Sequence, residues 1–331
     1  MLSVTYFYRE PRKTGFSIEG IFKLVRACLE HKIQIFEFYC DPKLSRFQNI
    51  KQAGKHAGAI NHITGDVNFL ALGLKGSNNI LTIHDFGFYE NPVHSKLVKF
   101  IYRLFWFLLP LKHVAIVTVV SEFTKQKLIN YFNFPQDRIR VIPDPVKPIF
   151  KSAPKEKLGV PPVILMMGTG KHKNLDNLIL ALKDTGFHVD IIGWPDKYEL
   201  GKMDEYGILY TVYNGLTDEE VYERYIACDV LFMASFYEGF GMPIIEAQSV
   251  GRPVITSNIG AMKEVGEGSA ILVEPNDSIA IREAILSLVN DTTLYNSCVN
   301  AGYINAGKYN YQKIAAQYLE VYQELEAKTN K

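Results

Sequence analysis

Short apolar runs alternate with amphipathic stretches along the first half of this 331-residue chain. Runs of strand length lie at 2–8, 33–38, 79–84, 114–120 and 138–143, and a helical pattern occupies 17–31. Ser121 is a suitable N-cap for a further amphipathic helix. Because strands that alternate with helices favour parallel sheets with crossover connections, this part is predicted to be a doubly wound α/β domain.

A second alternating series follows a proline-rich linker. Three prolines between 143 and 148 mark a stiff connection within a linker region of about 143–160. Apolar runs then lie at 162–167, 188–192 and 207–213, and helical patterns lie at 174–183 and 218–227. We therefore expect two Rossmann-like domains, residues 1–150 and 151–307, and a last helical segment at 308–331.

Composition indicates a globular protein with a substantial core, since 47% of residues are hydrophobic and 12% are aromatic. The formal net charge of +1 gives no bulk electrostatic case for a nucleic-acid partner. Four scattered cysteines lack metal-ligand spacing, which favours a reducing cytoplasmic compartment. The first ten residues are expected to form a strand and not a signal peptide.

The stretch 96–112 combines apolar and aromatic residues with Lys96, Lys99, Arg103 and Lys112. It is shorter than the roughly 20 apolar residues that a membrane span needs, and basic residues and a proline interrupt it. Two interpretations stay open, a helix packed in the core or a face that lies on the surface of a membrane.

The richest motif is Glu238-Gly-Phe-Gly-Met-Pro-Ile-Ile-Glu246. An apolar run at 229–235 precedes it, and Pro243 suits the first turn of a helix, so the order is strand, glycine loop, helix. The glycines let backbone amides approach a ligand, and the helix start favours an anion. Two carboxylates beside an anion site would accept hydrogen bonds from flanking sugar and ribose hydroxyls. The simpler alternative is an ordinary connection with surface glutamates.

The stretch 229–277 resembles the donor-binding half of the retaining GT-B glycosyltransferases of family 4, also called group 1. The resemblance implies two doubly wound domains with a central cleft, and a last helix that crosses back to the first domain. It also implies that Glu238 contacts the donor sugar and Glu246 the ribose. The backbone amides that would hold the diphosphate belong to Gly239, Phe240, Gly241 and Met242.

The loop Gly168-Thr-Gly-Lys-His-Lys-Asn174 opens a helix after the first strand of the second domain. The helix dipole disfavours lysines there, so a bound diphosphate would explain them better. By the resemblance, Lys173 is the phosphate ligand, while Lys171 and Thr169 stand where the family has a further cation. The alternative is a pair of solvated lysines.

In the first domain, His84 ends the strand 79–84, where the family has a histidine near the acceptor. Asp85 is expected to be a loop or cap residue, since adjacent strand residues point in opposite directions. Gly15 stands where the family has a glycine loop over the diphosphate. In the second domain, the segment 214–217 fits either a contact to the nucleotide base or a turn with a cap at Thr217.

No Asp-x-Asp, P-loop or dinucleotide fingerprint occurs in the sequence. Taken with these absences, the resemblance implies a metal-independent, cofactor-free retaining transferase that moves a hexose from a nucleoside-diphosphate sugar to a glycan or lipid-linked acceptor. Bacterial surface polysaccharide synthesis, at the cytoplasmic face of the cell membrane, would be its setting. Two alternatives are a nucleotide-sugar-binding protein without transferase activity and a GT-B-like epimerase.

Overall fold

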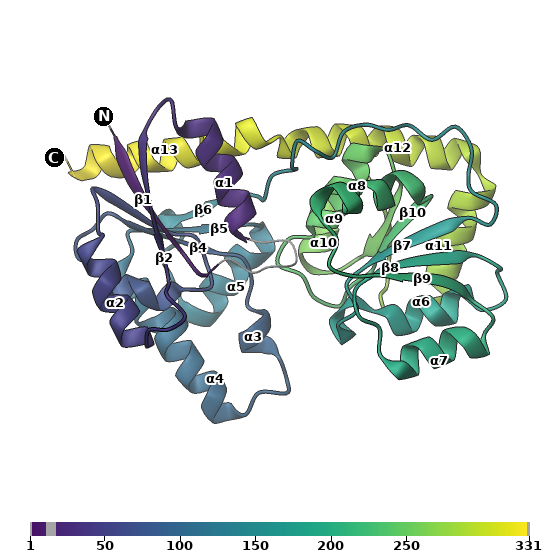
Figure 1. The fold of residues 1–331 in the computed structure, drawn as a ribbon, viewed down its shortest axis with the longest axis horizontal. Helices are drawn as coiled ribbons and strands as arrows, with labels where there is room; N and C mark the ends of the chain where they lie inside the picture. Colours follow the sequence, from purple (N-terminus) through teal and green to yellow (C-terminus); the bar gives the residue numbers. More distant parts are fainter. Residues whose placement is uncertain (1, 11–17, 330–331) are drawn as a thin grey trace. The chain divides into compact units, whose positions relative to one another are not determined.

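The computed structural model describes residues 2–10 and 18–329, and the chain forms two compact units (Figure 1). One unit comprises Met1–Pro145 together with Tyr311–Lys331, and the other comprises Val146–Asn310. These divisions lie five and three residues from the predicted boundaries at 150 and 307. The last helix is part of the first unit.

The first unit is built on a six-stranded parallel sheet of order β2-β1-β3-β4-β5-β6. The strand order reverses between β1 and β3, since β2 is added on one side of β1 and β3 on the other, which creates a topological switch point there. The strands are β1 (Ser3–Tyr8), β2 (Gln34–Tyr39), β3 (Ile60–Ile63), β4 (Asn79–Ile83), β5 (Ile116–Val119) and β6 (Ile139–Val141). The α-helices are α1 (Ile18–Leu29), α2 (Arg46–Lys55), α3 (Gly87–Glu90), α4 (Lys96–Tyr102), α5 (Glu122–Phe132) and α13 (Tyr311–Thr329).

Shorter helical segments complete this unit. They are the 3₁₀ segments η1 (Asn68–Gly73), η3 (Pro110–His113) and η4 (Gln136–Arg138), and the π-helical η2 (Arg103–Leu108). The expected cap at Ser121 is confirmed, because its side chain accepts a hydrogen bond from the amide of Thr124.

A buried polar network joins α13 to the sheet of the first unit. His62 on β3 is fully buried, with Nδ1 2.8 Å from the Tyr322 hydroxyl and Nε2 2.8 Å from Oγ1 of Thr82. Tyr322 donates its own proton to the hydroxyl of Tyr6, so His62 donates from Nδ1 and accepts at Nε2. Burial lowers the pKa of His62 to about 3, which keeps the ring neutral.

The second unit is a six-stranded parallel sheet of order β12-β11-β10-β7-β8-β9. Strand β7 lies at the centre, β8 and β9 follow on one side of it, and β10, β11 and β12 follow on the other. The strands are β7 (Val163–Met167), β8 (His188–Ile192), β9 (Leu209–Tyr213), β10 (Val230–Met233), β11 (Val254–Ser257) and β12 (Ile271–Val273). The helices are α6 (Leu175–Leu182), α7 (Lys197–Glu205), α8 (Asp218–Ala227), α9 (Met242–Val250), α10 (Gly260–Gly266), α11 (Ser278–Asn290) and α12 (Thr292–Ala306). The 3₁₀ segments η5 (Lys171–Lys173) and η6 (Gly307–Tyr309) complete this unit.

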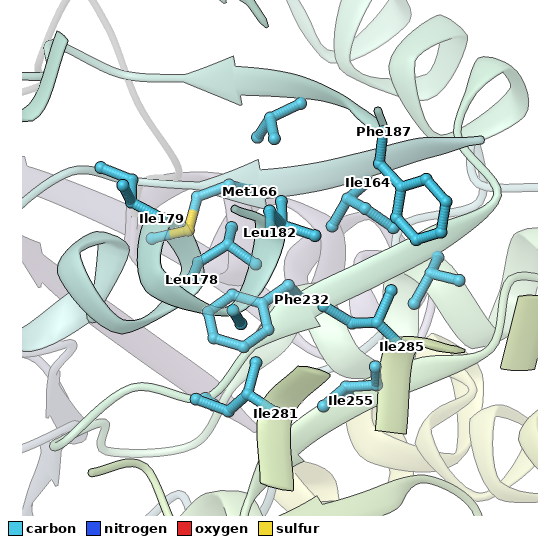
Figure 2. Close-up of a cluster of buried hydrophobic side chains, with 14 of the residues drawn as sticks. Ile164, Met166, Leu178, Ile179, Leu182, Phe187, Phe232, Ile255, Ile281 and Ile285 are labelled. Carbon is cyan, nitrogen blue, oxygen red and sulfur yellow. The ribbon is translucent and has the colours of Figure 1, made fainter. Parts of the chain in front are cut away.

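The core of the second unit lies between its sheet and helices α6 and α11 (Figure 2). Ile164 and Phe232 project from the two central strands onto Leu178 of α6 and Ile285 of α11, and all four are almost completely buried. Full burial of one such side chain contributes roughly 1.5–3 kcal/mol. This packing fixes the two central strands, whose ends carry the candidate site.

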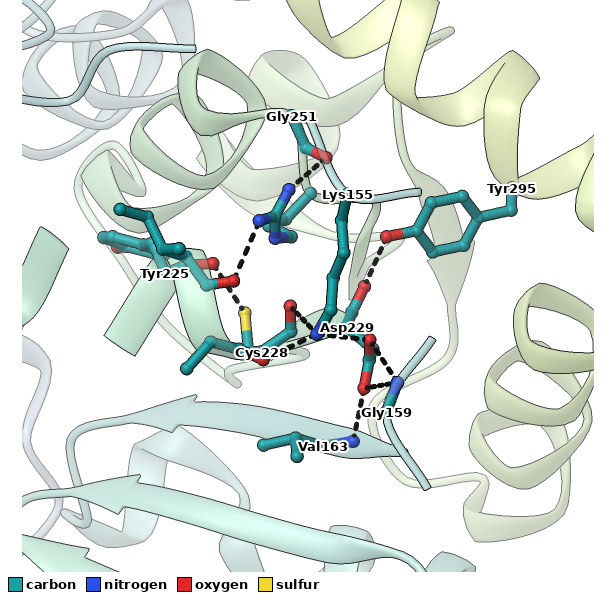
Figure 3. A network of polar contacts seen from close by, with 11 residues as sticks. Lys155, Gly159, Val163, Tyr225, Cys228, Asp229, Gly251 and Tyr295 are labelled. Carbon is teal, nitrogen blue, oxygen red and sulfur yellow. Dashed lines mark hydrogen bonds and ion pairs between the residues drawn. The ribbon is translucent and has the colours of Figure 1, made fainter. Parts of the chain in front are cut away.

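The segment that leads into β7 is attached to the second unit through Asp229, which is completely buried (Figure 3). One of its oxygens lies 2.6 Å from Nζ of Lys155, and its carboxylate accepts hydrogen bonds from the amides of Gly159 and Val163. The hydroxyl of Tyr295 donates to the backbone carbonyl of the same aspartate. The second half of the expected linker region therefore packs on the second unit.

The stretch 96–112 contains both buried and exposed residues, which supports core packing for its second half and leaves membrane contact a prediction. Phe107, Pro110 and Leu111 are buried in the first unit. Helix α4 buries none of its residues, and Leu97 and Phe100 are 67% and 61% exposed. Across residues 2–10 and 18–329, no helix has the length and apolar character needed to cross a membrane.

Candidate active site

Two loops meet at the carboxyl ends of β7 and β10, the neighbouring strands between which the strand order of the second unit reverses. The amide of Phe236 donates to the carbonyl of His172 at 2.7 Å, which ties the two loops together. Asn174, in the left-handed conformation with φ of 70°, donates from its buried side chain to the carbonyls of Ala234 and Pro275. Ligands bind at such switch points in open α/β sheets.

Lys173 and Glu238 face each other across these loops. Nζ of Lys173 lies 2.7 Å from Oε1 of Glu238, and the two side chains are 19% and 16% exposed. Gly168 has φ of +85°, and a Cβ there would lie 2.9 Å from Cε of Lys173. The glycine therefore leaves room for the lysine to lie over the loop, in an ion pair that a ligand can still reach.

Glu246 lies inside the protein, in contrast to Glu238. It is on the first turns of α9, which begins after Gly241 (φ of +108°) and has Pro243 in its first turn. Its Oε2 accepts a hydrogen bond from the hydroxyl of Tyr225 at 2.9 Å, and burial raises its pKa to about 7. Within the described part of the chain, Oε1 of Glu246 is buried without a hydrogen-bond partner.

The rest of the predicted donor loop lies between Glu238 and Glu246 in the chain. Gly239 lies in the loop before α9 and Met242 is the first residue of that helix, while the Phe240 ring is buried and lies edge-on to Tyr309 at 5.4 Å. Phe240 therefore serves the core with its ring and offers only its backbone to a ligand. The predicted backbone contacts to a diphosphate stay predictions.

The structure separates the two lysines of the η5 segment. Lys171 lies 3.3–3.5 Å from the carboxylates of Asp176, Asp196 and Glu199 and is 65% exposed. It is thus turned toward acidic groups of α6 and α7, and not toward Glu238. Its role as a second phosphate contact stays a prediction.

Thr169 supports the neighbouring loop, since its hydroxyl accepts from the amide of Trp194 at 2.9 Å. After β9, the edge strand of the sheet, Thr217 caps α8, and its side chain accepts a hydrogen bond from the amide of Glu220. This bears out the turn-and-cap interpretation of 214–217 and leaves a base contact untested.

His84 belongs to the first unit, at the end of β4. Its Nε2 donates a hydrogen bond to the carbonyl of Thr64 at 2.8 Å. The other ring nitrogen, Nδ1, lies 3.8 Å from Oδ1 of Asp144. Burial raises the pKa of the Asp144 carboxyl, and His84 opposes this. Asp85 accepts from the amide of Gly87, the local role expected for it. Gly15 lies outside the described residues.

Tyr225 and Asn174 are site residues that the sequence interpretation missed. A signal for Tyr225 did exist, because Glu246 directly follows two isoleucines at the start of the predicted helix. A buried carboxylate needs a donor, and a tyrosine in the preceding helix can supply one. Among the described residues, no group of three or more His, Cys, Asp and Glu side chains is placed to hold a metal ion.

The switch point, the Lys173–Glu238 pair and a buried carboxylate with one unsatisfied oxygen together form a candidate ligand site of an α/β protein. Family models extend this to the activity. Residues 149–305 match the model described as "Glycosyl transferases group 1", and residues 56–148 match "Glycosyltransferase Family 4". The chain belongs to this family of glycosyltransferases, which confirms the class predicted from the sequence.

Individual relatives agree with that assignment. O-antigen chain mannosyltransferase B of Escherichia coli is 27% identical over 270 residues, which cover 74% of this chain and 70% of that protein. Sucrose-phosphate synthase of Thermosynechococcus elongatus has the same fold, with a TM-score of 0.78 at 18% identity over 99% of this chain and 100% of that one. HepE of Anabaena, solved with UDP and glucose, has a TM-score of 0.73 at 15% identity over 97% and 99%. The two-domain GT-B fold is thereby confirmed.

Proposed function

We propose that this protein is a retaining, metal-independent hexosyltransferase that uses a nucleoside-diphosphate sugar as donor. Its acceptor is a glycan or a lipid-linked glycan of a bacterial surface polysaccharide, such as lipopolysaccharide or capsule. The observation that carries the proposal is the pairing of Lys173 with Glu238 at the switch point, together with the buried Glu246 about one turn into α9.

The donor site follows from the charges of these three residues. Lys173 supplies the positive charge that a departing diphosphate needs, and the amides at the start of α9 add their partial charges. Glu238 accepts hydrogen bonds from the sugar, and Glu246 accepts one from the ribose. His84 is assigned to the acceptor side on the family resemblance.

The reaction we propose needs no protein nucleophile. The bond between the anomeric carbon and the phosphate oxygen breaks, and the acceptor oxygen bonds to the same face of that carbon. The acceptor proton passes to an oxygen of the leaving phosphate. Lys173 stabilises the charge that develops on the leaving group, so a divalent metal is not required for this step.

The biological setting rests on the relatives. The Escherichia coli protein is an O-antigen chain mannosyltransferase, which supports a role in surface polysaccharide synthesis. Mannose is one candidate hexose on that ground. HepE was solved with UDP and glucose, which supports a nucleotide-sugar donor for this fold.

The exposed face of α4 supports the proposal that the enzyme acts at the cytoplasmic surface of a membrane. Leu97, Phe100 and Ile101 are 67%, 61% and 47% exposed, and Lys96 and Lys99 lie on the same helix. Apolar side chains interleaved with lysines fit an interface that carries anionic lipids. Such contact would place the enzyme beside a lipid-linked acceptor.

Thermal-shift titration tests the donor site. UDP, GDP, ADP and their common sugars are added without metal to the wild type, to Lys173→Ala and to Glu246→Ala, with Lys202→Ala of α7 as a surface-lysine control. Selective stabilisation by one nucleotide, lost in the two site variants and kept in the control, supports the proposal. No shift with any nucleotide at millimolar concentration would overturn it.

Turnover separates the remaining alternatives. Release of the nucleoside diphosphate only when an acceptor glycan is present, with the α-configured donor giving an α-linked product, supports a retaining transferase. Conversion of the donor sugar alone would indicate an epimerase. Tight binding with no turnover on any acceptor would indicate a binding protein.

A further inference from the structure

One carboxylate oxygen of Glu246 accepts a hydrogen bond within the protein, and the other has no hydrogen-bond partner among the described residues. Its side chain is completely buried, Oε2 is bonded to Tyr225, and Oε1 has no hydrogen-bond partner among the described residues. An unsatisfied buried acceptor costs free energy, and native proteins rarely keep one without a use. Oε1 is therefore available to a donor that the protein itself does not supply.

Tyr225 determines which oxygen is left over. Its hydroxyl lies 2.9 Å from Oε2 of Glu246 and 2.8 Å from Sδ of Met167, the last residue of β7. The hydroxyl has one proton, and a carboxylate is a much stronger acceptor than a thioether, so the proton points to Glu246. The Tyr225 ring is fully buried and lies edge-on to Phe150 at 5.5 Å, which holds the hydroxyl in place.

We infer that Tyr225 is a positioning residue of the donor site, which fixes Glu246 so that its Oε1 accepts a hydrogen bond from a ribose hydroxyl. The inference rests on the proposed function, because it takes the ligand to be a nucleoside diphosphate. Tyr225 itself touches no ligand in this scheme. Its contribution passes entirely through the orientation and charge of Glu246.

The charge of Glu246 provides a readout that a purely structural tyrosine would not affect. Burial raises the pKa of Glu246. The hydrogen bond from Tyr225 and the charge of Lys147 lower this pKa, whereas the charge of Asp218, which pairs with Lys147 at 2.7 Å, raises it. Removing the Tyr225 hydroxyl takes away a stabilising bond to the charged form, so the pKa of Glu246 rises further. The ionised acceptor is then lost at a higher pH than in the wild type.

The experiment compares nucleotides with and without ribose hydroxyls. Calorimetric titration measures the Kd of UDP and GDP and of their 2′,3′-dideoxy counterparts for the wild type, Tyr225→Phe and Glu246→Gln. Tyr295→Phe is the matched control, because it also removes one buried tyrosine hydroxyl of this unit, the one bonded to the Asp229 carbonyl. The melting temperature of each variant without ligand verifies that it is folded.

For Tyr225→Phe we expect about tenfold weaker binding of the ribonucleotide and unchanged binding of the dideoxynucleotide. The pH below which ribonucleotide binding weakens should also rise, while Tyr295→Phe leaves both quantities as in the wild type. Equal weakening of both nucleotides in Tyr225→Phe, or an unmoved pH profile, would overturn the inference.

The same measurements separate this inference from the proposed function. If the wild type binds neither UDP nor GDP, or shows no preference for the ribonucleotide, the proposed donor site fails. If Glu246→Gln abolishes the ribose preference and Tyr225→Phe keeps it, the donor site stands and the role of Tyr225 is overturned.

Discussion

Nζ of Lys173 and Oε1 of Glu238 lie 2.7 Å apart, so the cation expected to hold a diphosphate is paired with a carboxylate. A diphosphate must therefore share Lys173 with Glu238. The ion pair keeps Lys173 in place, but the negative charge of Glu238 weakens the attraction of the lysine for an anionic ligand.

Opposite effects on product binding are expected for the two partners of this pair. Lys173→Met should weaken nucleoside-diphosphate binding and lower kcat by about 10²–10³-fold, the range seen when one group that stabilises a developing charge is removed. Glu238→Gln should tighten nucleoside-diphosphate binding, since Lys173 is freed, and still lower kcat. Calorimetry and steady-state kinetics give both quantities. Weaker product binding in Glu238→Gln would show that the pair does not compete with the diphosphate.

The Lys155–Asp229 contact should matter for stability and not for binding. Lys155→Met leaves the buried Asp229 carboxylate without its cation, for which we expect a loss of about 3–5 kcal/mol in the free energy of unfolding. Lys202→Met, which breaks the exposed pair with Glu205, should cost less than about 1 kcal/mol. Denaturant titration of both variants measures the difference, and equal losses would argue against a buried anchor.

Acid should destabilise the first unit through His62. The pKa of His62 is about 3 in the folded protein and near 6.5 when unfolded, so the unfolded state binds the extra proton first as the pH falls. The stability is fully present above about pH 6.5 and falls by up to about 1.4 kcal/mol per pH unit between that pH and about 3.

Denaturant unfolding at pH 7, 6 and 5 checks this dependence on His62. The variant His62→Gln can still bond to Tyr322 and Thr82 but does not titrate, so its stability should change less over the same range. An identical slope in the variant and the wild type would assign the acid sensitivity to other groups.

The exposed face of α4 should bind anionic lipid. In sedimentation with phosphatidylglycerol vesicles, Phe100→Ser should reduce binding by about tenfold, since each buried aromatic side chain contributes roughly 1.5–3 kcal/mol. Ile304→Ser is the control, because Ile304 is 74% exposed on α12 of the other unit. Unchanged vesicle binding in Phe100→Ser would remove α4 as the contact.

The sequence predicts the donor loop well because local rules determine it. An apolar strand, glycines and a proline at the helix start set the order of β10, the 234–241 loop and α9. The relation between Lys173 and Lys171 is not local. Both are loop lysines in the sequence, and only the packing of α7 shows that acidic partners draw Lys171 away.

Strand β3 shows the opposite case. Ile60-Asn-His-Ile63 places two polar residues in a four-residue strand, so its apolar pattern is too weak to predict it. These residues are buried because their partners lie elsewhere, and the partner of His62 is Tyr322, 260 positions later. Tyr225 and Glu246 likewise come from two helices that are separated by a strand, and hydrophobic periodicity carries no information about such pairs.

The discontinuity of the first unit has a consequence for synthesis on the ribosome. Val146–Asn310 is one unbroken segment, so the second unit has been synthesised in full before α13 is made. The first unit lacks α13 until then, and His62 and Tyr6 stay without the hydroxyl of Tyr322. Although its sheet is translated first, this unit can complete its fold only after the whole of the second unit has been synthesised, in contrast to the usual N-to-C order.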